Sequence, residues 1–267
     1  ALLIFIGMVG YDNITDKAQP TTPVQQEQQK VSKHEKSAAM ALFTSLLPPK
    51  EEWPSPVHKF YLAFNMDEVI DPIRQNPNWT SLDAMSRDIP QALIAIEDHA
   101  FYNHGAIAVE GILRAALANI NAGEVVQGGS TLTQQFVKNV FLSHEQSMER
   151  KIEEAVLSLM LEDNYSKDEI LELYLNTTYF GAGSTGIKHA SRTYFGKAPS
   201  ALTLAEAAVI ASLPYAPTSL NPLENPEGCK KRQLLVLAAM HKYGMINQGQ
   251  LAEAKAEKIR LTNGTVM

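Results

Sequence analysis

The sequence has one cysteine, little excess charge of either sign and no apolar run long enough to cross a membrane. Cys229 is alone among 267 residues, so the chain can form no internal disulfide, and cysteine usage does not indicate a compartment. A net charge of −6 argues against a nucleic-acid-binding protein that relies on counterion release. We therefore expect no nucleic acid among its partners, while a hydrophobic content of 45% is ample for a folded core.

The first ten residues are wholly apolar. As a helix they would rise only ~15 Å against a hydrocarbon core of ~30 Å, so they cannot span a bilayer alone. We expect residues 1–10 to be the remnant of an N-terminal membrane span or signal segment, the alternative being a short amphipathic or core helix. Residues 11–55 are expected to be a flexible tether and connector, because 12–36 is rich in Gln, Lys, Thr and Pro.

The remainder, 56–267, is expected to form one folded domain that is mostly α. Phe60 to Phe64 is typical of a short strand or a buried segment. Apolar residues at helical spacing and helix-terminal residues then predict helices over 91–102, 109–121, 132–141, 149–161, 167–176, 186–194, 202–213 and 226–243. The segment 149–161 is apolar on both sides, which favours a central helix, and Gly244 is expected to end the last helix.

A first group of ionisable residues follows Pro90. Glu97, Phe101 and His104 recur at i, i+4 and i+7, so a helix carried that far would place them on one face, with Asp98 beside them. The structural alternative is a solvated helix end. A metal role for His99 and His104 is weaker, because no ligand spacing such as His-Glu-x-x-His accompanies them.

A second group lies in the segment Gly-Gly-Ser-Thr-Leu-Thr-Gln-Gln. It is not a P-loop, because Gly129 occupies the position at which that motif needs its lysine. A glycine-permitted turn capped by two hydroxyls therefore leads into a helix, whose N-terminus suits an anion or is simply capped without a ligand. The candidate binding residues of this turn and of the helix that follows it are Ser130, Thr131, Gln134, Gln135 and Lys138.

A third group is Arg150, Lys151 and Glu154. Arg150 and Glu154 are i, i+4 neighbours, and an exposed pair of this kind is worth only ~0.3–0.5 kcal/mol. If the helix is buried, Glu154 needs a partner cation, a metal ion or a raised pKa.

These groups, in this order, resemble the peptidoglycan glycosyltransferases of glycosyltransferase family 51, found as transglycosylase domains of class A penicillin-binding proteins and as monofunctional enzymes. The resemblance runs from about 56 to 256, over the motifs EDHAFYNH, GGSTLTQQFVKN, RKIEEAVLSLMLE, SKDEILELYLNTTYFGAGSTGI and LTLAEAAVIASLPYAPTSLNP. It implies a lysozyme-like, two-lobed helical fold, with a head and a smaller membrane-proximal jaw on either side of a cleft. The implied activity is polymerisation of lipid II into glycan strands.

The resemblance also implies roles for individual residues. Glu97 matches the general base, which takes the proton from the 4-hydroxyl of the acceptor N-acetylglucosamine as that oxygen attacks C1 of the donor N-acetylmuramic acid. Glu154 matches a second acid that assists departure of undecaprenyl diphosphate, with a divalent cation, Mg²⁺, as the implied cofactor. The implied substrate-binding residues are Asp98, Phe101, His104, Ser130, Thr131, Gln134, Gln135, Lys138, Arg150 and Lys151, while Tyr174 and Asn176 match a chiefly structural motif.

Inversion at a sugar carbon sets requirements for the two acids. Inverting hydrolases hold their carboxyl groups ~6.5–9.5 Å apart to admit the nucleophile. We therefore expect Glu97 and Glu154 to face one cleft without touching, and partial burial against Phe101 to raise the pKa of Glu97.

The sequence departs from the family pattern at three positions. Ala106 and Ala108 replace a common Gly and Asp, so the turn there is expected to differ and any acceptor contact of that Asp is lost. Gln146 stands where many relatives have a basic residue, which predicts weaker donor binding. No Ser-x-x-Lys or Lys-Thr-Gly motif of a transpeptidase is present.

The expected location is the bacterial cytoplasmic membrane, with a single N-terminal anchor and the catalytic domain on the extracytoplasmic side. Besides lipid II and the growing glycan strand, the expected partners are the lipid bilayer and cell-wall synthesis or division proteins. Two alternatives stay open, a lysozyme-like enzyme that cleaves glycans and a non-catalytic glycan-binding scaffold.

Overall fold

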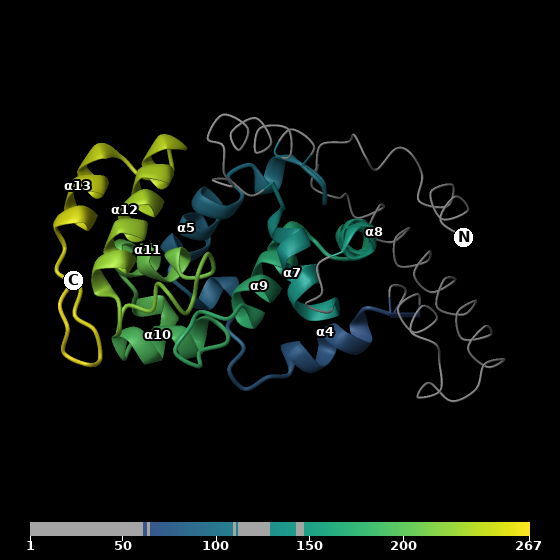
Figure 1. The fold of residues 1–267 in the computed structure, drawn as a ribbon, viewed down its shortest axis with the longest axis horizontal. Helices are drawn as coiled ribbons and strands as arrows, with labels where there is room; N and C mark the ends of the chain where they lie inside the picture. The colour runs from purple at the N-terminus through teal and green to yellow at the C-terminus, as the bar shows by residue number, and fades with distance from the viewer. Residues whose placement is uncertain (1–60, 63–64, 109–110, 112–128, 143–146) are drawn as a thin grey trace.

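A computed structural model describes residues 61–62, 65–108, 111, 129–142 and 147–267, and within these ranges the chain is helical (Figure 1). The α-helices are α4 (Asp67–Arg74), α5 (Asp88–Glu97), α7 (Leu132–Phe141), α8 (Met148–Asn164), α9 (Lys167–Thr177), α10 (Ile187–Phe195), α11 (Leu204–Ser212), α12 (Pro226–Lys242) and α13 (Gln248–Ala256). Three short 3-10 helices are η3 (Leu82–Ala84), η4 (Phe101–Asn103) and η5 (Pro199–Ala201). In these ranges β pairing is limited to two isolated bridges, Tyr179–Thr185 and Arg260–Val266. The expected mostly α fold is confirmed.

Side-chain caps fix where the helices begin. α7, α9, α11 and α13 each start with a capping box, in which the N-cap side chain and the side chain three residues later bond to each other's backbone. α12 starts with Asn225 as N-cap and Pro226 in its first turn, and Gly244 follows its end with φ +73°. These local signals explain why α7, α9 and α12 were predicted to within a residue or so.

α11 forms the centre of the first group of helices. Its residues from Ala205 to Ser212 are all buried, and four of them are alanine, so neighbouring helices can approach closely. α5 and α12 both pack against α11 and against each other, α13 packs on α12, and α10 contacts α11. Figure 1 shows these helices gathered at the end of the molecule that holds the C-terminus.

α7 organises the second group. It packs against both α8 and α9, and α4 packs against α9. A contact between α9 and α10 joins the two groups, and a single hydrophobic core runs through both, from Met66 on the N-terminal side to Leu261 near the C-terminus.

The helix predicted over 91–102 ends early, so one prediction about the site is wrong. α5 stops at Glu97, and Asp98 leaves the helical region with φ −157° and ψ 69°. Phe101 lies on the separate helix η4 and His104 follows it. Glu97, Phe101 and His104 therefore do not share the face of one helix.

The helix predicted over 149–161 is α8, but it is not central. Its main partner is α7, and Met148 and Ile152 are 79% and 49% exposed. The central position belongs to α11, whose burial on all sides matches its mostly apolar composition better.

Other predictions were incomplete or fall outside the described residues. α4 and α13 were not predicted, and Tyr61 and Leu62 are helical, so a strand is wrong at those two positions, although Tyr61 is buried as expected. Of the helix predicted over 109–121, the structure describes only residue 111, which is helical. The predicted segments 1–10 and 11–55 lie outside the described residues. Across the ranges that are described, no helix combines the length and apolarity needed to cross a bilayer.

Two glycines in the turn after α9 allow a direct test of packing. Gly181 and Gly183 both have positive φ, +87° and +70°, but a Cβ on Gly181 would lie 2.2 Å from the carbonyl oxygen of Pro217, whereas one on Gly183 would meet nothing within 4 Å. We expect Gly183→Ala to lower the free energy of unfolding by ~1 kcal/mol through backbone strain. Gly181→Ala should lower it by ~2 kcal/mol or more, because the clash adds to the strain. Urea denaturation followed by circular dichroism measures both, and equal losses would contradict the close approach.

Candidate active site

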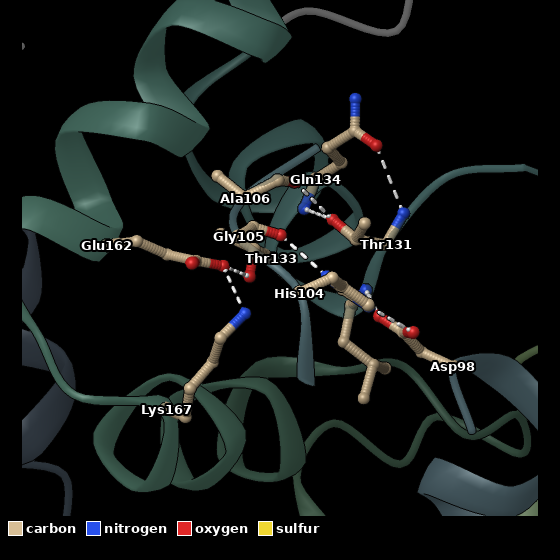
Figure 2. A network of polar contacts seen from close by, with 10 residues as sticks. Asp98, His104, Gly105, Ala106, Thr131, Thr133, Gln134, Glu162 and Lys167 are labelled. Atoms are coloured by element: carbon tan, nitrogen blue, oxygen red, sulfur yellow. Dashed lines mark hydrogen bonds and ion pairs between the residues drawn. The ribbon is translucent and has the colours of Figure 1, made fainter. Parts of the chain in front are cut away.

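The carboxylate of Asp98 joins two helices that are distant in the sequence (Figure 2). Asp98 directly follows the last residue of α5, and its Oδ2 accepts the backbone N–H of Leu132, the first residue of α7, at 3.0 Å. Its Oδ1 lies 2.6 Å from Nε2 of His104. A carboxylate at a helix N-terminus is favourable because it faces the positive end of the helix dipole. Asp98 therefore fixes the end of α5 relative to the start of α7.

His104 makes two hydrogen bonds that determine its charge. Nε2 faces the Asp98 carboxylate and Nδ1 lies 2.6 Å from the carbonyl oxygen of Gly105. A backbone carbonyl and a carboxylate are both acceptors, so these contacts favour the imidazolium, in which both ring nitrogens donate. Burial on its own lowers the pKa of His104, but the hydrogen bond and charge of Asp98 and the Gly105 carbonyl outweigh it, so the pKa is raised. His104 thus holds Asp98 in place.

The side chains of Thr131 and Gln134 form hydrogen bonds within the protein. Thr131 Oγ1 donates to the carbonyl of Ala106 at 2.7 Å and accepts the N–H of Gln134 at 3.1 Å. The Gln134 side-chain oxygen accepts the N–H of Thr131 at 3.0 Å, and both residues are 2% exposed. For these two candidates the structure supports the alternative of a capped helix start without a ligand. Ala106 contributes its backbone carbonyl to this arrangement.

Phe101 is also an interior residue. Phe101 is fully buried, and Lys167 Nζ lies 4.5 Å from the centroid of its ring. Lys167 donates to Glu162 at 2.7 Å, and Glu162 also accepts the hydroxyl of Thr133 (Figure 2). These contacts indicate that Phe101 supports the site through packing.

Glu97, the last residue of α5, faces a neutral amide. Gln135 Nε2 donates to Glu97 Oε2 at 3.0 Å, and the hydroxyl of Tyr174 donates to Gln135 Oε1 at 3.0 Å. Burial raises the pKa of Glu97, and the bond from Gln135 and the charges of Arg232 and Lys138 offset part of that rise. The expected rise in the pKa of Glu97 is confirmed. The neighbours that offset it are Gln135, Arg232 and Lys138, and Phe101 is not among them.

Tyr174 keeps the Gln135 amide in one orientation. Tyr174 is 1% exposed, and burial followed by the negative charge of Glu97 raises its pKa, so the hydroxyl stays protonated as a donor. Asn176, its neighbour in the same motif, bonds the backbone of Thr80 in both directions, which agrees with the structural role implied for it.

Glu154, in contrast, is surrounded by cations. It is 1% exposed, Arg150 Nη1 donates to its Oε2 at 3.1 Å, and Lys151 Nζ donates to its Oε1. Lys151 also donates to Ser130 Oγ at 2.9 Å. The Lys151 side chain is 43% exposed. Of the three outcomes expected for a buried Glu154, the structure shows the partner cation. Nε of Arg150 is buried without a hydrogen-bond partner in the described part of the chain.

The two acids are separate but share a connection through α7. Within the described ranges, no hydrogen bond joins Glu97 to Glu154. Glu97 contacts Gln135 on α7, and Glu154 is linked through Lys151 to Ser130, which precedes α7. Lys138, one turn beyond Gln135, is exposed. The prediction that both acids face a common cleft stays a prediction.

The residues around Glu154 do not provide a metal site by themselves. Both of its oxygens accept hydrogen bonds from cations, and among the described residues no group of three or more His, Cys, Asp or Glu could hold a metal ion. Mg²⁺ usually takes one or two carboxylates together with water and substrate phosphates. A divalent cation at this place would therefore depend on ligands from the substrate and on displacement of Arg150 or Lys151.

The sequence did not point to two of the residues near Glu97. Tyr174 was expected to be chiefly structural, and its contact with Gln135, which orients that amide, was not predicted. Arg232 was not singled out, because it follows Lys230 and Lys231 in a run typical of a solvated helix face. No local signal distinguishes Arg232 from its neighbours, and its position becomes evident only when α12 packs against α5.

Comparison with known proteins shows the family of the chain. The transglycosylase family model matches residues 66–241. A protein of Cupriavidus necator described as a transglycosylase is 41% identical over 194 residues, which cover 73% of this chain and 84% of that protein. Penicillin-binding protein 1A of Neisseria flavescens is 44% identical over 185 residues, which cover 69% of this chain but only 23% of that protein. A crystal structure of penicillin-binding protein 1A from Haemophilus influenzae is 33% identical and covers 49% of this chain and 16% of that one, with a TM-score of 0.35.

The chain therefore belongs to the transglycosylase family. It is a glycosyltransferase, and the resemblance to glycosyltransferase family 51 is confirmed. It spans about a quarter of the penicillin-binding proteins that it matches.

The charge of His104 predicts how stability depends on pH. The folded-state pKa of His104 is raised above its unfolded value of ~6.5, so its contribution is complete below that value and is lost as pH rises through the folded-state pKa. We expect His104→Gln to be less stable than the wild type at about pH 6, and the difference to shrink as pH rises. Urea midpoints across this range measure it, with the exposed His241→Gln as control. A difference that is independent of pH would contradict the charged state.

Proposed function

We propose that this chain polymerises lipid II into glycan strands. The 4-hydroxyl of the acceptor N-acetylglucosamine attacks C1 of the donor N-acetylmuramic acid with inversion, and undecaprenyl diphosphate leaves. The observation that carries the proposal is the contrast between two acids, the partly buried Glu97 beside a neutral amide and the fully buried Glu154 beside two cations. The family membership supports the reaction class.

Glu97 acts as the general base. A partly buried carboxylate with a raised pKa binds a proton more strongly than a free one, which suits a base that works near neutral pH. It accepts the proton of the 4-hydroxyl as the new bond to C1 forms. The bond from C1 to the diphosphate oxygen breaks, and the electron pair leaves with the diphosphate.

Arg150 and Lys151 stabilise the departing diphosphate. Fixed cations in a water-poor site stabilise developing negative charge at little reorganisation cost. The buried Glu154 holds both side chains in place, and the half-exposed Lys151 and the exposed Lys138 are accessible to an anion. Ser130 positions Lys151 through its hydroxyl.

The family also implies a divalent cation, to which we assign no step of the reaction. The described residues do not form a metal site, so Mg²⁺ would be held mainly by the diphosphate itself. Assays with Mg²⁺ and with EDTA test whether turnover needs it.

The location and partners are proposed from the same resemblance. The location is the extracytoplasmic face of a bacterial cytoplasmic membrane, where a single N-terminal anchor holds the enzyme. The partners are lipid II, the growing strand, the bilayer and cell-wall synthesis or division proteins.

Substitution of the two acids tests the assignment with labelled lipid II. We expect Glu97→Gln to lower the rate of polymer formation by about 10²–10⁴-fold, because a neutral amide cannot accept the proton. Glu154→Gln should lower it as well, because Arg150 and Lys151 lose the group that holds them. Glu149→Gln, an exposed acid on α8, is the matched control and should retain activity. Equal polymer yield from wild type and Glu97→Gln would contradict the proposal, and release of shorter saccharides from preformed glycan would indicate a lysozyme-like enzyme instead.

The pH profile of the wild type provides an independent check. Since the base is active only when ionised, kcat/KM should fall as pH drops through the pKa of Glu97, and the midpoint should lie above the ordinary value of 4.5. A midpoint at or below that value would show that Glu97 is not the group that titrates.

A further inference from the structure

Tyr174, on α9, is a buried polar side chain that takes part in no step of the proposed reaction. It is 1% exposed, and its hydroxyl donates to Gln135 Oε1 at 3.0 Å. The nitrogen of the same amide donates to Glu97 Oε2, also at 3.0 Å. Two hydrogen bonds therefore connect a phenol in the interior, on α9, with the proposed base at the end of α5, through a side chain of α7.

Two neighbours on α9 hold Tyr174 in this position. Glu172 and Asn176 are four residues apart and share one face of the helix, whereas Tyr174 lies two residues from each and points to the opposite side. Glu172 and Asn176 both bond the segment 79–82, which precedes α5. The opposite side of α9 packs along α7 (Figure 1). One face of α9 is thus anchored, and the other presents the Tyr174 hydroxyl to Gln135.

The direction of these bonds determines which end of the Gln135 amide faces Glu97. Because Tyr174 donates to the amide oxygen, the amide nitrogen faces the carboxylate. Turning the amide over would remove the acceptor of a buried hydroxyl proton, which is unfavourable. Without the hydroxyl that cost is absent, and the amide oxygen is free to accept the proton of a neutral Glu97 carboxyl. Tyr174 therefore disfavours the protonated form of the base.

The bond from Gln135 also determines which oxygen of Glu97 is open. Burial raises the pKa of Glu97, and among the influences that lower it this bond is the largest. The charged groups that act in addition are Arg232, Lys138 and the adjacent Asp98. In the part of the chain that the structure describes, Gln135 bonds Oε2 and no hydrogen bond reaches Oε1. Oε1 is thus the oxygen that is left for a substrate.

We propose that Tyr174 is a positioning residue for Glu97. Through the Gln135 amide it keeps a donor on Oε2 and leaves Oε1 to take the proton of the acceptor hydroxyl. The role of Oε1 rests on the proposed function, whereas the orientation of the amide is independent of the reaction. No covalent step is added.

Removal of a single oxygen atom tests this role in the lipid II assay. Tyr174→Phe should lower kcat/KM about three- to tenfold on the acidic limb of the pH profile, because a smaller fraction of Glu97 is ionised. The loss should shrink as pH rises, with little change in KM. Tyr194→Phe is the matched control, since Tyr194 is also fully buried but its hydroxyl donates to the Phe180 carbonyl at 2.8 Å. This control should leave the limb where it is.

A double-mutant cycle shows whether Tyr174 acts through Gln135. Gln135→Met keeps an unbranched side chain on α7 but removes both ends of the amide. In the Gln135→Met background, Tyr174→Phe should have no further effect on the acidic limb, because the group that connects it to Glu97 is gone. A merely structural tyrosine would have the same effect in both backgrounds, and that result would contradict the proposal.

NMR titration of the Glu97 carboxyl carbon measures the base without substrate. Its signal is identified by its absence from Glu97→Gln, and Tyr174→Phe should move its midpoint to higher pH while Tyr194→Phe does not. A midpoint that Tyr174→Phe leaves unchanged, or that both variants move equally, would show that the inference is wrong. Should Tyr174→Phe prove unfolded by circular dichroism, the wild type decides, because its Tyr174 ring-carbon signal should titrate with the midpoint of Glu97, and a ring signal that does not respond would contradict the relay.

The outcomes separate this inference from the proposed function. If wild type forms polymer and Glu97→Gln does not, but the midpoint of Glu97 is indifferent to Tyr174, the proposed function stands and the inference fails. If the midpoint moves as expected but wild type forms no polymer, or Glu97→Gln is fully active, the proposed function fails, while the orientation of the amide by Tyr174 stands.

Discussion

The hydrogen bonds of Asp98 are the interaction on which the rest of the site depends. Its two oxygens bond the N–H of Leu132 and the ring of His104, so the end of α5 and the start of α7 cannot move independently. Gln135 lies in the first turns of α7 and therefore meets Glu97, the residue before Asp98. The adjacent carboxylates of Asp98 and Glu97 therefore differ in their surroundings. Both oxygens of Asp98 bond internal groups, whereas Glu97 accepts one hydrogen bond from a neutral amide.

The contrast between Glu97 and Glu154 follows from their neighbours. Glu154 lies among cations three and four residues earlier on its own helix, so local sequence supplies both partners of a buried charge. Glu97 ends its helix, and its neighbours come from α7 and α12. Burial with cations in contact favours a fixed charge, whereas burial beside an amide favours a group that exchanges its proton. The same residue type can therefore serve two functions within one domain.

The sequence predicted those parts of the fold that local interactions determine. α7 and α9 begin at capping boxes formed within four residues, and α12 ends before a glycine, so their positions could be predicted closely. The end of α5 could not, because Asp98 leaves the helical conformation to bond Leu132, 34 residues away. Motif spacing singled out the candidate acids and cations, and it left open whether the start of α7 binds an anion or is simply capped, as Thr131 and Gln134 cap it here. Arg232 was missed because its relation to Glu97 depends on packing between distant helices.

The identity of residue 135 shows how the basicity of Glu97 is balanced. Tyr174 donates to the oxygen of the Gln135 amide, so the nitrogen faces Glu97 and can only donate. A lysine or arginine in direct contact would hold the carboxylate ionised so strongly that it would be a poor proton acceptor. A carboxylate there would repel Glu97 and favour its protonated form. A neutral donor satisfies one oxygen and leaves burial as the dominant influence on the pKa, which the more distant charges of Arg232 and Lys138 reduce only in part. The position therefore requires a side chain that is both donor and acceptor but carries no charge.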